Sequence, residues 1–103
     1  MNDKNIGKKV IIRADRAGVF FGTLVSKNDT VAGVEVELKD CRRLWYWNGA
    51  CSLSELALSG TKTPNDCKFT VTLPSITIMQ VIEIIPCSDN AINSIEGVKI
   101  WEF

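Results

Sequence analysis

Residues 7–25, GKKVIIRADRAGVFFGTLV, decide the class of fold because two apolar segments flank a short polar one. Residues 8–13 and 18–25 are rich in β-branched and aromatic side chains, which favour strands. Ala14-Asp15-Arg16-Ala17 lies between them and suits a hairpin connection. Lys27-Asn28-Asp29 then has the composition of a turn. This stretch predicts a β-hairpin near the start of the chain.

Two more strands are predicted in the middle of the chain. Val34-Glu35-Val36-Glu37-Leu38 alternates between apolar and acidic residues, which is typical of a strand with one buried face. Lys39-Asp40 is expected to end that strand in a turn. Arg43-Leu44-Trp45-Tyr46-Trp47 is another β-favouring segment, and Asn48-Gly49 after it suits a type I′ turn.

The second half of the chain combines helix and strand signals. Ser52-Leu53-Ser54-Glu55 has the pattern of a capping box, and Gly60 is expected to end this helix after about two turns. Ser88 is a candidate cap for a second helical turn that ends near Gly97. Further strands are expected at residues 68–73, 76–85 and 98–103, the first two ended by Pro74 and Pro86.

These elements predict a single domain over residues 1–103. Six or seven short strands with one or two short helices indicate a mainly β fold of the α+β class. The expected architecture is a small twisted sheet or a partly open barrel. A chain of 103 residues, 46% of them hydrophobic, can bury a modest core.

The composition argues against several classes of function. The 12 basic and 12 acidic residues give no net charge, so nucleic-acid binding is not expected. The chain has no histidine, and it therefore lacks the commonest general base and the usual catalytic triads. No phosphate-binding loop, dinucleotide fingerprint or paired-carboxylate motif occurs. We expect a binding or assembly module and not an enzyme.

The four cysteines are expected to be free thiols. They lie at Cys41, Cys51, Cys67 and Cys87, and no two of them form the close pair that structural zinc sites normally use. No metal and no cofactor is predicted. Residues 1–5 contain no apolar leader segment, and no stretch approaches the length of a membrane span. A cytoplasmic protein without membrane contact is expected.

Two features favour a homo-oligomer. Residues 1–51 carry nine basic and six acidic residues, a formal charge of +3, whereas residues 52–103 carry three and six, a charge of −3. This asymmetry suits head-to-tail contact between copies, and it also fits a dipolar monomer. Residues 76–85 are apolar on both faces of the expected strand, which a second subunit or the two short helices would cover. One of those faces would carry Ile76, Ile78, Gln80, Ile82 and Ile84.

The candidate ligand-binding residues are four arginines and two tryptophans: Arg13, Arg16, Arg42, Arg43, Trp45 and Trp47. Guanidinium groups bind phosphate or carboxylate through paired hydrogen bonds, and indole rings stack on bases. On a strand, Arg43, Trp45 and Trp47 would share one face. The first hairpin would add Arg13 and Arg16 if it packs beside that strand. In the alternative interpretation, the tryptophans are core or subunit-interface residues and the hairpin arginines are solvated.

Residues 7–13, 18–24 and 34–38 resemble the first three strands of Sm-like and SH3-like barrels. In those barrels a glycine bends the second strand sharply, as the Gly22-Thr23-Leu24 step would do here. The second Sm motif, with its Arg-Gly pair, is absent. The resemblance implies a barrel and does not extend to ring-type RNA binding.

The chain also resembles a family of small, uncharacterised proteins of tailed phages and prophages. The likeness rests on residues 18–24, 42–50, 52–57 and 81–87. It implies a phage origin and an accessory role, and small phage proteins of this kind include inhibitors of bacterial defence. By analogy, we predict a counter-defence protein that sequesters a nucleotide-type anion as a homo-oligomer in the host cytoplasm. The alternatives are a module that inhibits a host protein or aids virion assembly, and an Sm-like nucleic-acid binder.

Overall fold

The computed structural model describes residues 4–102 of the chain. Within these residues the fold consists of four strands, two α-helices and one 3₁₀ turn (η1, Pro64–Asp66). The mainly β, α+β class that the sequence predicted is confirmed. In chain order the other elements are β1 (Lys9–Ala14), β2 (Gly18–Thr30), β3 (Gly33–Tyr46), α1 (Leu53–Ser59), β4 (Lys68–Pro86) and α2 (Asp89–Glu96).

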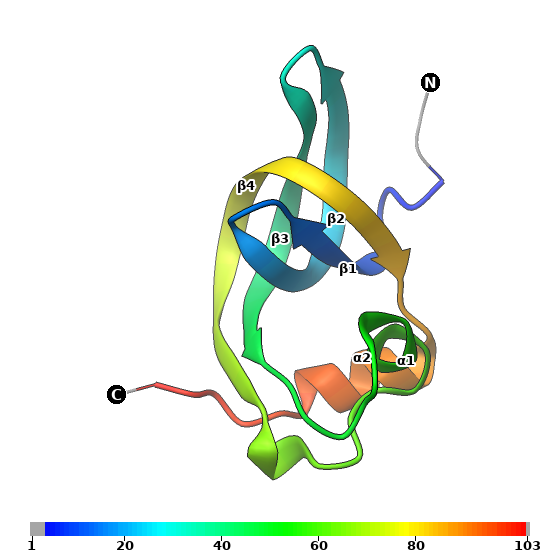
Figure 1. Ribbon diagram of the computed structural model, residues 1–103, viewed down its shortest axis with the longest axis vertical. Coiled ribbons are helices and arrows are strands. Elements are labelled where there is room, and N and C mark those ends of the chain that lie inside the picture. Colours follow the sequence, from blue (N-terminus) through cyan, green and yellow to red (C-terminus); the bar gives the residue numbers. More distant parts are fainter. Residues whose placement is uncertain (1–3, 103) are drawn as a thin grey trace.

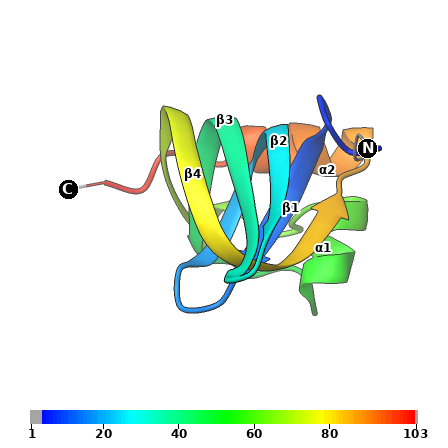
Figure 2. The same cartoon turned by 90° about the horizontal axis from the view of Figure 1, so that it is seen from above.

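The four strands close into a barrel. Each strand is antiparallel to the next, and β1 also pairs with β4, so the order β1-β2-β3-β4 has no open end. In Figure 1 the tips of β2 and β3 project beyond the barrel as a hairpin arm, and α1 and α2 lie together at the opposite end. Figure 2 looks onto the arm from above and shows the strands curving around one another.

Two buried clusters stabilise the fold, one inside the barrel and one beneath the helices. The side chains of β1 alternate between them, since successive residues of a strand point to opposite faces. Val10 and Ile12 lie in the barrel cluster, whereas Ile11 lies in the helix cluster. Phe20 and Phe21 of β2 divide in the same way. Because both faces of β1 are buried at its centre, Val10, Ile11 and Ile12 form a continuous apolar run.

The caps of both helices are confirmed. The Ser52 hydroxyl oxygen accepts a hydrogen bond from the backbone N–H of Glu55 at the start of α1 (3.1 Å). Ser88 accepts one from the N–H of Ala91 at the start of α2 (3.1 Å). Gly60, with a φ of 77°, ends α1 as expected.

Two predicted turns are wrong because their polar residues continue a strand. β2 extends through Lys27-Asn28-Asp29, which lies in the exposed arm, and the chain turns at residues 31–32 instead. β3 extends through Lys39-Asp40. Asp40 adopts a φ of 51° and, together with Cys41, lies opposite the single residue Gly22 of β2. This is a β-bulge, which places an extra residue in left-handed conformation within a strand.

The predicted type I′ turn at Asn48-Gly49 is also wrong, because this pair opens the connection from β3 to α1. Gly49 has a φ of 82°, and a Cβ atom there would lie 2.6 Å from the backbone nitrogen of Thr63. Glycine is therefore required by a left-handed backbone and a close approach between two loops.

The expected strands at residues 68–73 and 76–85 form one strand, β4, which passes through Pro74. The neighbours of Pro74 pair with β3, and within the described residues no strand pairs with the other edge of β4 at this point. A proline is tolerated at such an edge because no ladder donor is needed there. Residues 98–102 form a single parallel bridge, Phe69 to Ile100, and not the predicted terminal strand, whose last residue lies outside the described part.

The alternation expected along β4 is also broken. Gln80 adopts a φ of 59°, and the register against β3 shifts beside it. Val81 therefore joins the barrel cluster, while Ile82 points outward and is 54% exposed. Neither helix covers Met79, which is 62% exposed, whereas Ile85 near the end of β4 packs against the helix cluster, so the helices shield only part of the outer face of this strand. A homo-oligomer that covers it stays a prediction.

Candidate functional site

Arg42 and Arg43 are adjacent in β3 and point to opposite sides of it. Arg42 is only 4% exposed. Its guanidinium donates hydrogen bonds to three backbone carbonyl oxygens: from Nε to Thr70 (2.9 Å), from Nη1 to Ile95 (2.8 Å) and from Nη2 to Phe69 (3.1 Å). Burial lowers the pKa of Arg42 because it disfavours the charged form. This side chain ties β3 to β4 and to the end of α2.

Arg43 is exposed and lies beside the first hairpin. Its Nη1 donates to the carbonyl oxygen of Ala17 (3.1 Å), and its guanidinium carbon lies 4.6 Å from the ring centroid of Phe20. The hairpin therefore does pack beside this strand, which was the condition for the predicted arginine cluster. Arg42 nevertheless points away, so the four arginines do not form a single patch.

The other two arginines belong to the hairpin itself. Arg13 of β1 forms an ion pair with Glu83 of the neighbouring strand β4. Arg16 is exposed in the hairpin turn, where it adopts a φ of 67°. A positive φ is unusual for arginine and is set here by the three-residue turn between Ala14 and Gly18.

The tryptophans also separate. Trp45 is 58% exposed and stacks on Trp101, with ring centroids 4.9 Å apart and an interplanar angle of 24°. The Nζ atom of Lys68 lies 5.2 Å from the Trp45 ring and 5.5 Å from the Trp101 ring. Trp47 follows the end of β3 and packs against the helix cluster. The expected face of Arg43, Trp45 and Trp47 is thus replaced by Trp45, Lys68 and Trp101, which we call the tryptophan surface.

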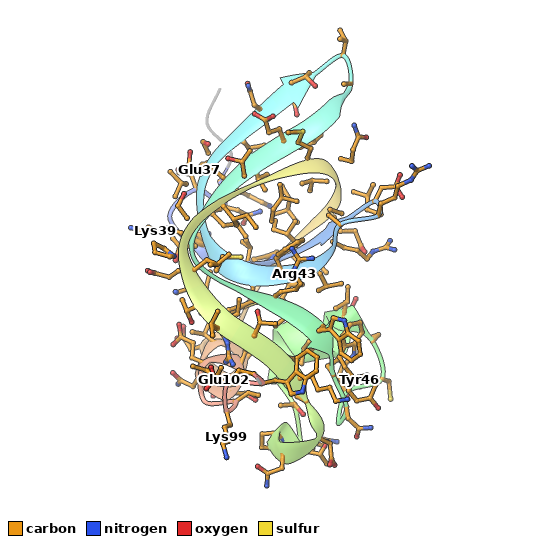
Figure 3. All side chains as sticks on the ribbon, turned by 90° about the vertical axis from the view of Figure 1, so that its left-hand side faces the viewer. Glu37, Lys39, Arg43, Tyr46, Lys99 and Glu102 are labelled. Carbon is orange, nitrogen blue, oxygen red and sulfur yellow. The ribbon has the colours of Figure 1, made fainter. Side chains whose placement is uncertain are left out.

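Backbone pairing places Trp101 on this surface. Its N–H donates to the carbonyl oxygen of Phe69 (2.9 Å), next to the bridge between Phe69 and Ile100. The segment after α2 thereby runs along the first residues of β4. Figure 3 shows Arg43 near the middle of the molecule, and Tyr46 and Glu102 farther from the hairpin arm.

Two surface hollows border Trp101. One, of about 300 Å³, also contacts Thr70, Val71 and Glu102. The other, of about 380 Å³, is lined by Trp101 together with Asn65 and Lys99 among others. Both volumes fall in the range of small-molecule sites. Four further apolar side chains in β3, β4 and the segment after α2 are 43–46% exposed: Tyr46, Val71, Leu73 and Ile100.

Sequence reasoning missed Lys68 and Trp101. The available signal was a third tryptophan near the end of the chain. Whether Trp101 joins the surface depends on which strand the last residues contact. That contact joins residues more than thirty positions apart in the chain. No local pattern reports such a pairing.

The thiols and carboxylates of residues 4–102 form no group that could hold a metal ion. All four cysteines are free. Burial raises the pKa of Cys41 to about 11 and that of Cys87 to about 12, so both thiols stay protonated at neutral pH. No helix in the same residues combines the length and apolar character needed to cross a membrane.

Residues 7–95 match the model of the family described as Domain of unknown function (DUF6948), and the chain belongs to this family. The match runs from before β1 to Ile95, one residue before the end of α2, and so does not include Trp101. No curated protein and no solved structure matches the chain.

Proposed function

We propose that this chain is a phage-encoded, non-enzymatic accessory protein that binds a nucleotide-type anion at the tryptophan surface. The observation that carries the proposal is the stacked, exposed pair Trp45–Trp101 with the Lys68 ammonium across both rings. Stacking of a base on an indole contributes roughly 1–3 kcal/mol per base. A lysine at the ring face supplies positive charge for a phosphate.

The ligand's base would stack on Trp101 within the hollow of about 380 Å³. Lys99, which lines the same hollow, would then contact a phosphate, and Asn65 offers an amide for hydrogen bonds. Arg13, Arg16, Arg43 and Trp47, which lie elsewhere, have no direct role in this arrangement.

The biological part of the proposal follows the resemblance to phage and prophage proteins. The protein would act against host defence in the cytoplasm of the infected cell, by sequestering a nucleotide signal as a homo-oligomer. We likewise propose, from sequence resemblance alone, that the barrel is related to Sm-like and SH3-like domains. An Sm-like role in nucleic-acid binding is disfavoured, because the chain has no net charge to neutralise a phosphate backbone.

Isothermal titration against cyclic nucleotides and ADP-ribose-type nucleotides tests the ligand. Micromolar binding should be lost in Trp101→Ala and weakened in Lys68→Gln. Lys39→Gln, which removes an exposed lysine of β3, is the matched control and should bind as the wild type does. An absence of heat across the panel with folded protein would refute nucleotide binding.

The second candidate function is a protein-binding module that inhibits a host protein or aids virion assembly. The specific observation in its favour is the exposure of Tyr46, Val71, Leu73 and Ile100 together with the two tryptophans. Aromatic side chains dominate the binding energy of protein interfaces. A stoichiometric protein partner that resists nuclease and nucleotides, and is lost in Trp45→Ala, would favour this function over the first.

A further inference from the structure

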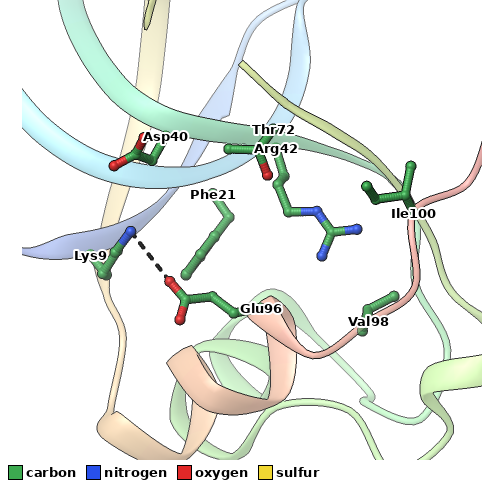
Figure 4. A pocket seen from close by; sticks show the side chains of 8 residues that line it. All are labelled: Lys9, Phe21, Asp40, Arg42, Thr72, Glu96, Val98 and Ile100. Atoms are coloured by element: carbon green, nitrogen blue, oxygen red, sulfur yellow. Dashed lines mark ion pairs between the residues drawn. The ribbon is translucent and has the colours of Figure 1, made fainter. Parts of the chain in front are cut away.

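A third hollow lies between the barrel and α2, and it shares only Ile100 with the hollow of about 380 Å³ beside Trp101. Its volume is about 300 Å³, and Lys9, Phe21, Arg42, Thr72 and Glu96 are among the residues that line it. Figure 4 shows the Arg42 guanidinium directed into the space beside Glu96, with apolar side chains of the segment after α2 on the far side. All four strands and α2 contribute to this cavity.

The charge of Arg42 is compensated only in part. Three of its N–H groups bind backbone carbonyl oxygens, and a guanidinium carries five. In residues 4–102 no carboxylate lies within ion-pair distance of it. Buried charges in proteins are normally paired, since an isolated one is poorly solvated. Arg42 is only 4% exposed, two of its N–H groups have no carbonyl partner, and its guanidinium borders the cavity. These features favour an anion at this position.

The acidic residues of the cavity lie nearer to water. Asp40 is exposed, and Glu96 has a 47% exposed side chain that pairs with Lys9 at 3.3 Å. Water screens charges at the rim, whereas the buried guanidinium is screened far less. The formal charges of the lining residues cancel, but the most deeply buried of them is the positive charge of Arg42.

We propose that this cavity binds a small oxyanion, a phosphate or a carboxylate, between Arg42 and Lys9. The two remaining N–H groups of Arg42 would donate to the anion, and the Thr72 hydroxyl would add a neutral donor. Lys9 would exchange its partner Glu96 for the ligand. The volume leaves room for a small apolar substituent against Phe21. This inference does not depend on the proposed function.

Inorganic phosphate and acetate are the probes, each titrated against the full chain by calorimetry and thermal unfolding at an ionic strength matched with chloride. Saturable binding of phosphate, with a Kd on the order of 1 mM, is expected for the wild type. Saturation by both probes would indicate a general oxyanion site, and saturation by phosphate alone a phosphate site. Stabilisation no greater than that given by chloride would overturn the proposal.

The variants separate this site from general charge effects. Lys9→Met should weaken phosphate binding about tenfold, whereas Lys8→Met, the exposed neighbour, should leave it unchanged. Glu96→Gln should strengthen binding, because it removes the competing carboxylate, and Glu37→Gln, in the part of β3 that pairs with β4, should not. Equal effects of Lys9→Met and Lys8→Met would contradict the proposal. Trp101→Ala should bind phosphate normally, so the failure of either proposal leaves the other standing.

Discussion

Replacing Arg42 should destabilise the protein far more than replacing Arg43, although the two are adjacent in sequence. Arg42→Met keeps a long, flexible side chain in the same space and removes all three hydrogen bonds to carbonyl oxygens. Arg43→Met is the matched control, because it removes one hydrogen bond and one cation–π contact at an exposed position.

The expected loss follows from these contacts. Hydrogen bonds from a charged group contribute about 1.5–3 kcal/mol each, so the three of Arg42 sum to roughly 4–9 kcal/mol. Desolvation of the buried guanidinium costs several kcal/mol in the wild type, and methionine avoids that cost. The free energy of unfolding should therefore fall by about 2–3 kcal/mol in Arg42→Met. For Arg43→Met the loss should be about 0.5–1 kcal/mol.

Urea unfolding followed by circular dichroism measures both losses, with the slope of the transition as a check that the unfolded states are comparable. The Tm of Arg42→Met should fall by about 10 °C or more. Arg42→Lys should recover little of the loss, since one ammonium cannot reach three carbonyl groups as a planar guanidinium does. Equal losses in Arg42→Met and Arg43→Met would refute the argument that the carbonyl contacts stabilise the fold.

Three further predictions concern stability. Gly60→Ala should lower the free energy of unfolding in urea by at least about 1 kcal/mol more than Gly7→Ala does. Both glycines have a positive φ, but only at Gly60 would the new Cβ lie 2.3 Å from another side chain. Equal losses in the two variants would contradict this prediction. The pKa of Cys87 is raised from 9.0 to about 12, so the unfolded chain loses that proton first and the free energy of unfolding should fall as the pH rises above about 9. Urea midpoints at about pH 8 and about pH 10.5 should differ less in Cys87→Ala, and an unchanged difference would count against the assignment. A double-mutant cycle between Trp45→Ala and Trp101→Ala should give a coupling of about 0.5–1.5 kcal/mol, and a coupling of zero would show that the stacking does not stabilise the fold.

The types of residue at the candidate site could be predicted from the sequence, but only some of the residues themselves could. One interpretation of residues 42–47 was a surface that combines aromatics with a cation; Trp45 is exposed beside the Lys68 ammonium, and its role in binding a ligand stays a prediction. Its partners Lys68 and Trp101 come from other segments, because the chain after α2 pairs with the start of β4. Arg42 and Arg43 have the same residue type and neighbouring positions, so only the covering by β4 and α2 makes one buried and the other exposed.

The predicted turns were wrong where polar residues or proline lie inside a strand instead of ending it. Lys39-Asp40 carries the composition of a turn, yet Asp40 supplies the left-handed residue of a bulge inside β3. Pro74 ends a strand only when the sheet needs a donor at that position, and β4 has no strand partner on that side within the described residues. A local pattern cannot distinguish these cases, because they depend on what pairs with the strand.

By itself the sequence determined the elements that local physics controls: the strand-forming segments at residues 8–13 and 18–25, the caps at Ser52 and Ser88, and a chemistry without histidine. Short-range sterics favour the strand segments, and side chain-to-backbone hydrogen bonds fix the caps. The closure of the barrel by β1 and β4, the burial of Arg42 and the stacking of Trp45 on Trp101 were decided only by the tertiary structure. Each of these joins residues distant in the chain, and their contact energy exists only once the strands have paired.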